Sequence, residues 1–181
     1  SPFGDNRRIT VGLLGGSFNP AHAGHLYISI EAIKRLNLDE VWWLVSPQNP
    51  LKSMMEMAKQ VERVQGAQRI SNHPRIRVSA IEKGLNTRYT VDTLVKLKIR
   101  FPHIRFVWLM GADNLAQIPK WKKWKRIFAL VPVAVFDRND YSCRAGRLKA
   151  AQVFAVEKFQ HIDIFHLLHC KNIGSYALYP V

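Results

Sequence analysis

The hydrophobic pattern of the chain alternates between two periods. Short apolar runs predict buried strands, and longer segments with apolar residues every three or four positions predict amphipathic helices. This alternation predicts an α/β fold, a Rossmann-like doubly wound parallel sheet of about five or six strands with helices on both faces. The expected strands are Ile9–Leu14, Val41–Val45, Ile76–Val78, Phe106–Met110, Val133–Phe136 and Ile162–Phe165, and the expected helices are Leu26–Leu36, Ala58–Ser71, Thr90–Arg100, Ile127–Val131 and Arg144–Val156, with a short helix from Asp113.

Two expected helices carry finer predictions. In Ala58–Ser71 the residues Val61, Val64, Ala67 and Gln68 or Ile70 lie near one face, which is the spacing of a helix. In the next helix, the hydroxyl of Thr90 stands where an N-cap residue is expected.

The segment Gly15–His25 joins the first expected strand to the first expected helix. Unpaired N–H groups and the helix dipole favour anions at such a place, and Gly15 and Gly16 let a ligand approach the backbone closely. His22 and His25 are three residues apart, so they share a face at the helix start. The segment therefore predicts a phosphate-binding turn, although both histidines could also simply cap or fill the helix.

A second turn, Gly111–Asn114, follows the fourth expected strand. The carboxyl ends of parallel strands lie at one edge of a sheet, and ligands bind there where the strand order reverses. We therefore expect the two turns to share a site. Asp113 could cap a helix or hold a ribose hydroxyl.

Composition narrows the class of protein. The 181 residues are expected to form a single domain over 1–181, with irregular structure in 1–8 and roughly 169–181. No apolar run is long enough for a membrane span, and two cysteines without CxxC spacing favour free thiols in a reducing cytoplasm. The net charge of +14 favours anionic partners without choosing among nucleotides, nucleic acid and membranes.

Several familiar signatures are absent. The sequence contains no Walker A, GxGxxG, HExxH or GxSxG pattern, which disfavours P-loop, dehydrogenase and ordinary hydrolase functions. His161, His166 and His169 form a loose group without cysteine or carboxylate at ligand spacing, so no protein metal site is expected.

The segment Lys120–Arg126 interleaves lysines with Trp121 and Trp124. Such a pattern is typical of nucleic-acid binding, because bases stack on the rings while cations meet phosphates. A solvated basic rim around a small-molecule site is the alternative.

The segment Gly15–His25 resembles the GGxFxPxHxGH form of the HxGH motif of nucleotidyltransferases. Within that superfamily the chain resembles the bacterial nicotinate-nucleotide adenylyltransferases. The further matching segments run in order, and they are Ser46–Lys52, Thr87–Thr93, Gly111–Asn114, Trp121–Trp124 and Phe136–Arg138.

The resemblance implies adenylyl transfer from ATP to nicotinate mononucleotide, which gives deamido-NAD and pyrophosphate. Mg²⁺ would arrive with ATP rather than at a protein site. Neither a membrane nor a specific nucleic acid is expected as a partner, and a homo-oligomer is left open. Carried over by position, the catalytic residues would be His22 and His25; the ATP-binding residues Gly15, Gly16, Ser17, Phe18, His22, His25, Gly111 and Asp113; and the mononucleotide-binding residues Lys52, Tyr89, Thr90, Trp121 and Arg138.

The chain departs from the family pattern in two places. Leu51 stands where the family has a histidine before Lys52, and the closing Ile-Ser-Ser/Thr-x-x-Arg motif, which binds ATP phosphates, is missing. We therefore expect weakened ATP binding. Two alternatives stay open, namely a related HxGH nucleotidyltransferase with another phosphate acceptor, and a basic, non-catalytic nucleic-acid-binding module.

Overall fold

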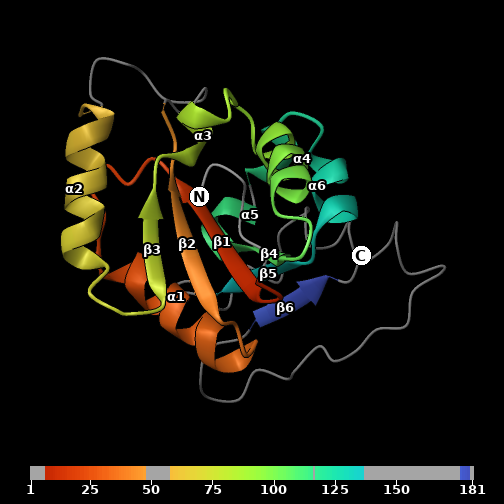
Figure 1. Ribbon diagram of the computed structural model, residues 1–181, viewed down its shortest axis with the longest axis horizontal. Coiled ribbons are helices and arrows are strands. Elements are labelled where there is room, and N and C mark those ends of the chain that lie inside the picture. The colour runs from red at the N-terminus through yellow and green to blue at the C-terminus, as the bar shows by residue number, and fades with distance from the viewer. Residues whose placement is uncertain (1–6, 48–57, 116, 137–175, 180–181) are drawn as a thin grey trace.

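A six-stranded sheet forms the centre of the molecule (Figure 1). The computed structural model describes residues 7–47, 58–115, 117–136 and 176–179. The strands are β1 (Thr10–Gly16), β2 (Glu40–Val45), β3 (Ile76–Ser79), β4 (Arg105–Gly111), β5 (Val133–Phe136) and β6 (Tyr176–Tyr179). Their order is β3-β2-β1-β4-β5-β6.

The five strands β1 to β5 are parallel, as the sequence predicts, and β6 is not. β6 runs antiparallel to β5, with Tyr176 opposite Phe136 and Tyr179 opposite Val133. The chain end, expected to be irregular, therefore contributes an edge strand over these four residues. The predicted helix Arg144–Val156 and strand Ile162–Phe165 lie outside the described residues.

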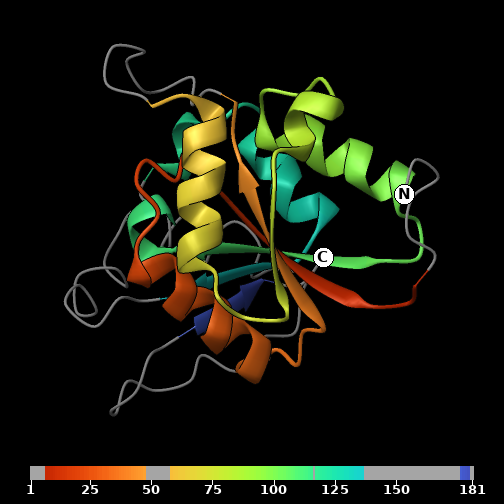
Figure 2. The same cartoon turned by 60° about the vertical axis from the view of Figure 1, so that its left-hand side comes forward.

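Helices cover both faces of the sheet, which confirms the predicted doubly wound architecture. Buried side chains of α1 and α2 belong to one apolar cluster, and those of α4 and α6 to another on the opposite face (Figure 2). The helices are α1 (Ala23–Arg35), α2 (Gln60–Ile70), α3 (Ile81–Gly84), α4 (Thr90–Arg100), α5 (Ala112–Leu115), the 3₁₀ helix η2 (Ile118–Lys120) and α6 (Trp124–Leu130).

In the central strands β2 and β4, the runs Val41–Val45 and Phe106–Met110 are apolar because successive side chains enter different clusters. In β2, Trp42 and Leu44 pack toward α4 and α6, whereas Trp43 and Val45 pack toward α1 and α2. The same alternation holds in β4, so neither of these strands exposes a face to solvent. This is the physical reason for the continuous apolar runs in the sequence.

The apolar residues of α2 that share a face differ in burial. Val61 is 67% exposed and Ile70 is 36% exposed, while Ala67 and the charged Arg63 are buried. The helix lies so that Arg63 points inward to bond backbone carbonyls, which turns Val61 and Ile70 outward. Helical periodicity alone does not anticipate a buried cation.

The predicted N-cap at Thr90 is also wrong. Tyr89 occupies the N-cap position with extended backbone angles, makes no side-chain capping bond, and Thr90 is the first helical residue. Of the described helices, none is long and apolar enough to cross a membrane.

The strand order reverses between β1 and β4, which lie side by side although β2 and β3 come between them in sequence. A doubly wound sheet opens a crevice at such a switch point, outside the carboxyl ends of the strands. The turn after β1 and the turn after β4 therefore meet at one edge of the sheet.

Candidate active site

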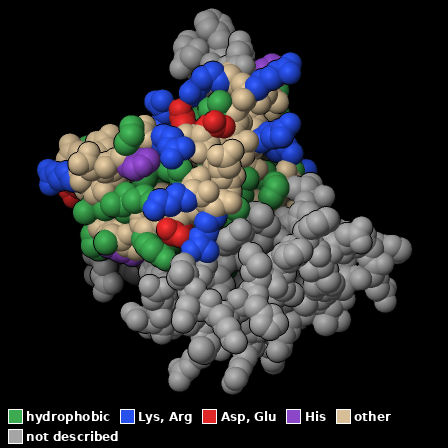
Figure 3. Space-filling model, turned by 90° about the horizontal axis from the view of Figure 1, so that it is seen from below, with side chains coloured by type: hydrophobic (Ala, Val, Ile, Leu, Met, Phe, Trp, Pro, Cys, Tyr) green, Lys and Arg blue, Asp and Glu red, His purple; other side chains and the backbone are tan. Residues whose placement is uncertain are grey.

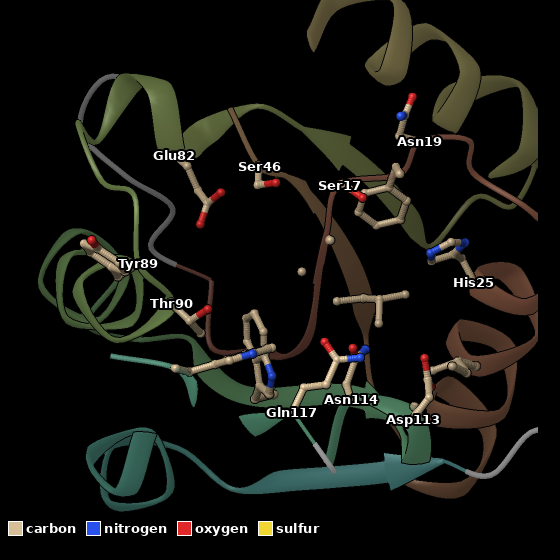
Figure 4. A pocket seen from close by; sticks show the side chains of 18 of the residues that line it. Ser17, Asn19, His25, Ser46, Glu82, Tyr89, Thr90, Asp113, Asn114 and Gln117 are labelled. Atoms are coloured by element: carbon tan, nitrogen blue, oxygen red, sulfur yellow. The ribbon is translucent and has the colours of Figure 1, made fainter. Parts of the chain in front are cut away.

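A cavity of about 420 Å³ lies at the carboxyl edge of the sheet (Figure 4). The volume is that of a small-molecule site. The turns after β1 and β4 form part of its wall, and the start of α4 and the segment around η2 form another part. The predicted site residues that line it are Gly15, Gly16, Ser17, Phe18, His22, His25, Tyr89, Thr90, Gly111, Asp113 and Trp121.

Two predicted site residues, Lys52 and Arg138, lie outside the described part of the chain. Among the residues that the structure describes, no group of three or more His, Cys, Asp or Glu side chains is placed to hold a metal ion.

His22 and His25 form a capping box at the start of α1. His22 is the N-cap, and its Nδ1 accepts from the backbone N–H of Gly24 at 3.2 Å. The backbone N–H of His22 donates to Nδ1 of His25 at 3.3 Å. Capping is therefore a real role of both residues, and it begins α1 at Ala23, earlier than predicted.

The capping box also sets the tautomer of both rings. A neutral imidazole has one N–H donor and one acceptor nitrogen, and in each ring Nδ1 is used as an acceptor. The hydrogen then resides on Nε2, which is the donor of the ring. The rings lie with centroids 4.0 Å apart and both line the cavity, so the cap and a donor role coexist.

Aromatic packing holds His25 in place. Its ring lies 4.7 Å from that of Phe18 and 5.9 Å from that of Trp43, and Phe18 stacks on Trp43 at 5.2 Å. Phe18 has a φ of 49°, a left-handed conformation that costs free energy for a bulky residue. Burial of its ring, which is 2% exposed, offsets that cost.

Ser29 supports the same cluster from inside α1. Its hydroxyl donates to the carbonyl of His25 at 2.8 Å and accepts from Nε1 of Trp43 at 2.7 Å. Phe18, predicted as an ATP contact, is therefore mainly a core residue that shapes the turn at the cavity wall.

Gly15 has a packing reason to be glycine. A Cβ atom there would overlap the indole of Trp108, which stands on the neighbouring strand β4. Trp108 in turn lies edge-on to Trp121, with centroids 6.3 Å apart at 85°. This contact connects the turn after β1 to the far part of the cavity.

That far part, here called the ring end, comprises Tyr89, Thr90, Trp121 and Lys122. Lys122 donates to Asp92 at 2.9 Å and lies 4.6 Å from the centre of the Tyr89 ring. Trp121 and Trp124 both pack against the apolar cluster that contains the buried side chains of α4 and α6. The tryptophans of Lys120–Arg126 therefore serve the cavity and the core, which disfavours the reading of this segment as a nucleic-acid surface.

On the face seen in Figure 3, Lys and Arg side chains lie at several places among apolar and neutral polar groups. Positive charges of this kind raise the local concentration of anions.

Three polar side chains that the sequence reasoning did not single out lie at or behind the cavity wall. Glu82 enters from α3, a short helix that was not predicted, and Figure 4 shows its side chain pointing into the cavity. The hydroxyl of Thr93 donates to the Glu82 carboxyl at 2.9 Å, and burial raises the pKa of Glu82. Arg63 lies behind the turn after β1. Ser46 follows β2 directly.

Two buried polar atoms of the described residues have no hydrogen-bond partner, Oγ of Ser46 and Nε1 of Trp108. Both residues line the cavity. A buried donor without a partner destabilises the fold by about 1–3 kcal/mol. Their position at the cavity is therefore consistent with a site that completes its hydrogen bonds with a ligand.

Comparison with known proteins agrees with this geometry. The cytidylyltransferase-like family model matches residues 13–175. A protein of Parvibaculum lavamentivorans named probable nicotinate-nucleotide adenylyltransferase is 56% identical over 143 residues, which cover 79% of this chain and 71% of that protein. One of the same name from Methylorubrum extorquens is 50% identical over 155 residues, 86% of this chain and 84% of the other.

The fold is also shared with solved structures. A nicotinic acid mononucleotide adenylyltransferase of Plasmodium falciparum, complexed with NaAD, superimposes with a TM-score of 0.58 at 18% identity, covering 83% of this chain and 85% of that one. With the cavity at the β1/β4 switch point, the histidine capping box that lines it and relatives of about 50% identity, the chain belongs to the nicotinate-nucleotide adenylyltransferase family.

Proposed function

We propose that the chain transfers the adenylyl group of ATP to nicotinate mononucleotide, releasing deamido-NAD and pyrophosphate. The observation that carries the proposal is the capping box, because it gives His22 and His25 Nε2–H donors on a cavity wall made by a helix start. Family membership supports the choice of reaction, since relatives of about 50% identity carry that name.

The reaction needs alignment and charge stabilisation more than a protein nucleophile. A phosphate oxygen of the mononucleotide attacks the α-phosphorus of ATP, and the bond from that phosphorus to the oxygen bridging the β-phosphate breaks. Pyrophosphate leaves with the electron pair of that bond. The attacking phosphate is already an anion, so no base has to remove a proton.

His22 and His25 act in this scheme as donors to the phosphate oxygens, where charge builds up as the α-phosphorus becomes five-coordinate. Gly15, Gly16 and Ser17 line the cavity beside the two rings. Because the rings are held by the capping box and by Phe18, little reorganisation is required in the transition state.

The ring end suits the pyridine nucleotide. Trp121 offers an aromatic surface at the cavity, and Tyr89 and Thr90 lie at the start of α4, where unpaired N–H groups favour a carboxylate. Gly111 and Asp113 at the β4 end would contact ATP. Lys52 and Arg138 remain predicted contacts of the mononucleotide.

Mg²⁺ would enter as part of the ATP substrate. It neutralises phosphate oxygens and leaves with pyrophosphate. This assignment rests on the usual chemistry of ATP rather than on a cluster of side chains.

The test is an assay of the purified chain with Mg·ATP and one acceptor at a time. Pyrophosphate release and the adenylylated product are measured with nicotinate mononucleotide, nicotinamide mononucleotide, pantetheine phosphate and glycerol phosphate. We expect the highest kcat/KM with nicotinate mononucleotide. A higher value with any other acceptor would contradict the proposed substrate, and tight oligonucleotide binding at physiological salt without turnover would favour the nucleic-acid alternative.

A further inference from the structure

Arg63 is a buried cation in the first turns of α2. It is 3% exposed, and within the described part of the chain its guanidinium donates to backbone carbonyls alone. Nε donates to Ala58 at 2.9 Å, Nη1 to Ser17, and Nη2 to Ser46 at 2.9 Å and Pro47 at 3.0 Å. No carboxylate among the described residues pairs with it, and arginine stays charged even where burial lowers its pKa.

The carbonyls that Arg63 binds belong to the loops at the wall of the cavity. Ser17 is in the turn after β1, Ser46 and Pro47 follow β2, and Ala58 leads into α2. Ser17 and Ser46 both line the cavity. Figure 4 shows these two residues on neighbouring segments of its wall.

Two further hydrogen bonds join the same segments. The backbone N–H of Ser46 donates to the carbonyl of Gly16 at 3.0 Å, and Gln60 of α2 donates to the carbonyl of Val45 at 2.9 Å. The first turn of α2 therefore fastens the carboxyl ends of β1 and β2 together, with Arg63 at the centre of the junction. The residue held most directly, Ser46, carries the buried hydroxyl without a partner.

We infer that Arg63 is a positioning residue for substrate phosphate. It fixes Ser17, directly after β1, and Ser46, directly after β2, in the geometry that receives phosphate oxygens, and its positive charge attracts those oxygens from behind the wall. This role rests on the proposed adenylyl transfer. A purely structural arginine would instead stabilise the fold and leave the affinity for ATP unchanged.

The experiment compares Arg63→Lys and Arg63→Gln in the full chain. Lysine keeps the charge but loses the planar fork, and glutamine loses the charge and most of the donors. We expect kcat to fall by about 10-fold in R63K and by about 100-fold in R63Q, because small misplacements of reacting groups cost about that much. The Kd of Mg·ATP, measured by calorimetry without acceptor, should rise in the same order.

The matched control is Arg75→Gln. Arg75 also donates to a backbone carbonyl, that of Leu38 at 3.3 Å, near the amino edge of the sheet and away from the cavity. The R75Q variant should differ from the wild type in Tm at most, with the same kcat and the same Kd of Mg·ATP.

A lower Tm in R63K, with kcat and the Kd of Mg·ATP unchanged, would overturn the inference. If R63Q does not fold, the comparison of R63K with the wild type is the test. A wild-type chain that binds Mg·ATP but adenylylates none of the four acceptors would count against the proposed function instead. In that case the Kd comparison still decides whether Arg63 serves the phosphate site.

Discussion

The amino and carboxyl edges of the sheet each bury a charged side chain, Glu40 and Arg63, but the two have different kinds of partners. At the amino edge, Glu40 accepts from Arg7 at 2.8 Å, from Arg77 at 2.7 and 3.0 Å, and from Trp42 at 2.8 Å. At the carboxyl edge, as far as the described residues go, Arg63 donates to carbonyls alone, and Oγ of Ser46 and Nε1 of Trp108 have no hydrogen-bond partner. The amino edge therefore pairs its buried carboxylate with arginines. Among the described residues, the carboxyl edge keeps a buried guanidinium without a carboxylate and two polar atoms without a hydrogen bond.

The difference separates stability from function. A fully paired amino edge can stabilise the fold without regard to substrates. The unpaired groups at the carboxyl edge lower the stability of the empty protein, and the rest of the fold has to offset this cost. Binding of an anion would stabilise this edge by giving those groups a partner. Four predictions test this contrast, from the largest expected effect to the smallest.

His22→Ala should lower kcat by about 100–1,000-fold, as loss of a transition-state donor does elsewhere. His22→Asn retains a capping oxygen for the N–H of Gly24 but lacks the Nε2 donor, so it should recover stability and not activity. His25→Ala should resemble H22A in kcat. His73→Ala, near the amino edge, is the control and should keep the wild-type rate; near-wild-type turnover in H22A would remove the histidine from the mechanism.

Glu40→Gln should reduce the free energy of unfolding by up to about 3 kcal/mol at neutral pH without changing kcat. Burial would raise the pKa of Glu40, but bonds from Arg77, Arg7 and Trp42 lower it to about 2 from 4.5. The ionised group therefore stabilises the fold above about pH 4.5, and this contribution disappears as the pH falls toward 2. Urea unfolding across that range measures it, and equal stability of E40Q and wild type at pH 7 would contradict the pairing.

Trp121→Ala should raise the KM for the mononucleotide by about 10-fold, within the range for loss of one base-stacking contact. The KM for ATP should change little, and Trp121→Phe should restore most of the affinity. A mononucleotide KM that stays at the wild-type value in W121A would move the stacking role to another ring.

Glu82→Gln should give the smallest effect and one of opposite sign to that at Glu40. Burial raises the pKa of Glu82, so its folded form is favoured when protonated, and stability is lost as the pH rises through that raised pKa. The glutamine side chain of E82Q does not ionise, so this variant does not lose stability in that way as the pH rises. Thermal unfolding from pH 4 to 8 should show E82Q gaining on the wild type with increasing pH, and a constant difference would show that ionisation of Glu82 costs nothing.

The fold could be predicted from the sequence because burial on two faces imposes a simple pattern. The runs Val41–Val45 and Phe106–Met110 are apolar at every position, as is typical of strands in a sheet that is covered on both faces. The turn at Gly15–His25 was predictable for the same kind of reason, since strand, glycines and paired histidines occupy fixed places along a short segment.

Arg63 and Glu82 could not be found in this way. A charged residue in a helix ordinarily faces solvent, and nothing in the order of residues shows that three carbonyls converge on Arg63 from two distant loops. Glu82 depends on α3, a helix of four residues that carries no detectable period. Val61 and Ile70 are exposed for a related reason, because the buried guanidinium of Arg63 sets the rotation of α2.

The histidine cap ties the orientation of two cavity side chains to the start of one helix. The backbone N–H of Gly24 holds Nδ1 of His22, and the backbone N–H of His22 holds Nδ1 of His25. Both rings therefore depend on the same two backbone N–H groups. A substitution that displaces the start of α1 would move both rings together, even where it lies far from the cavity.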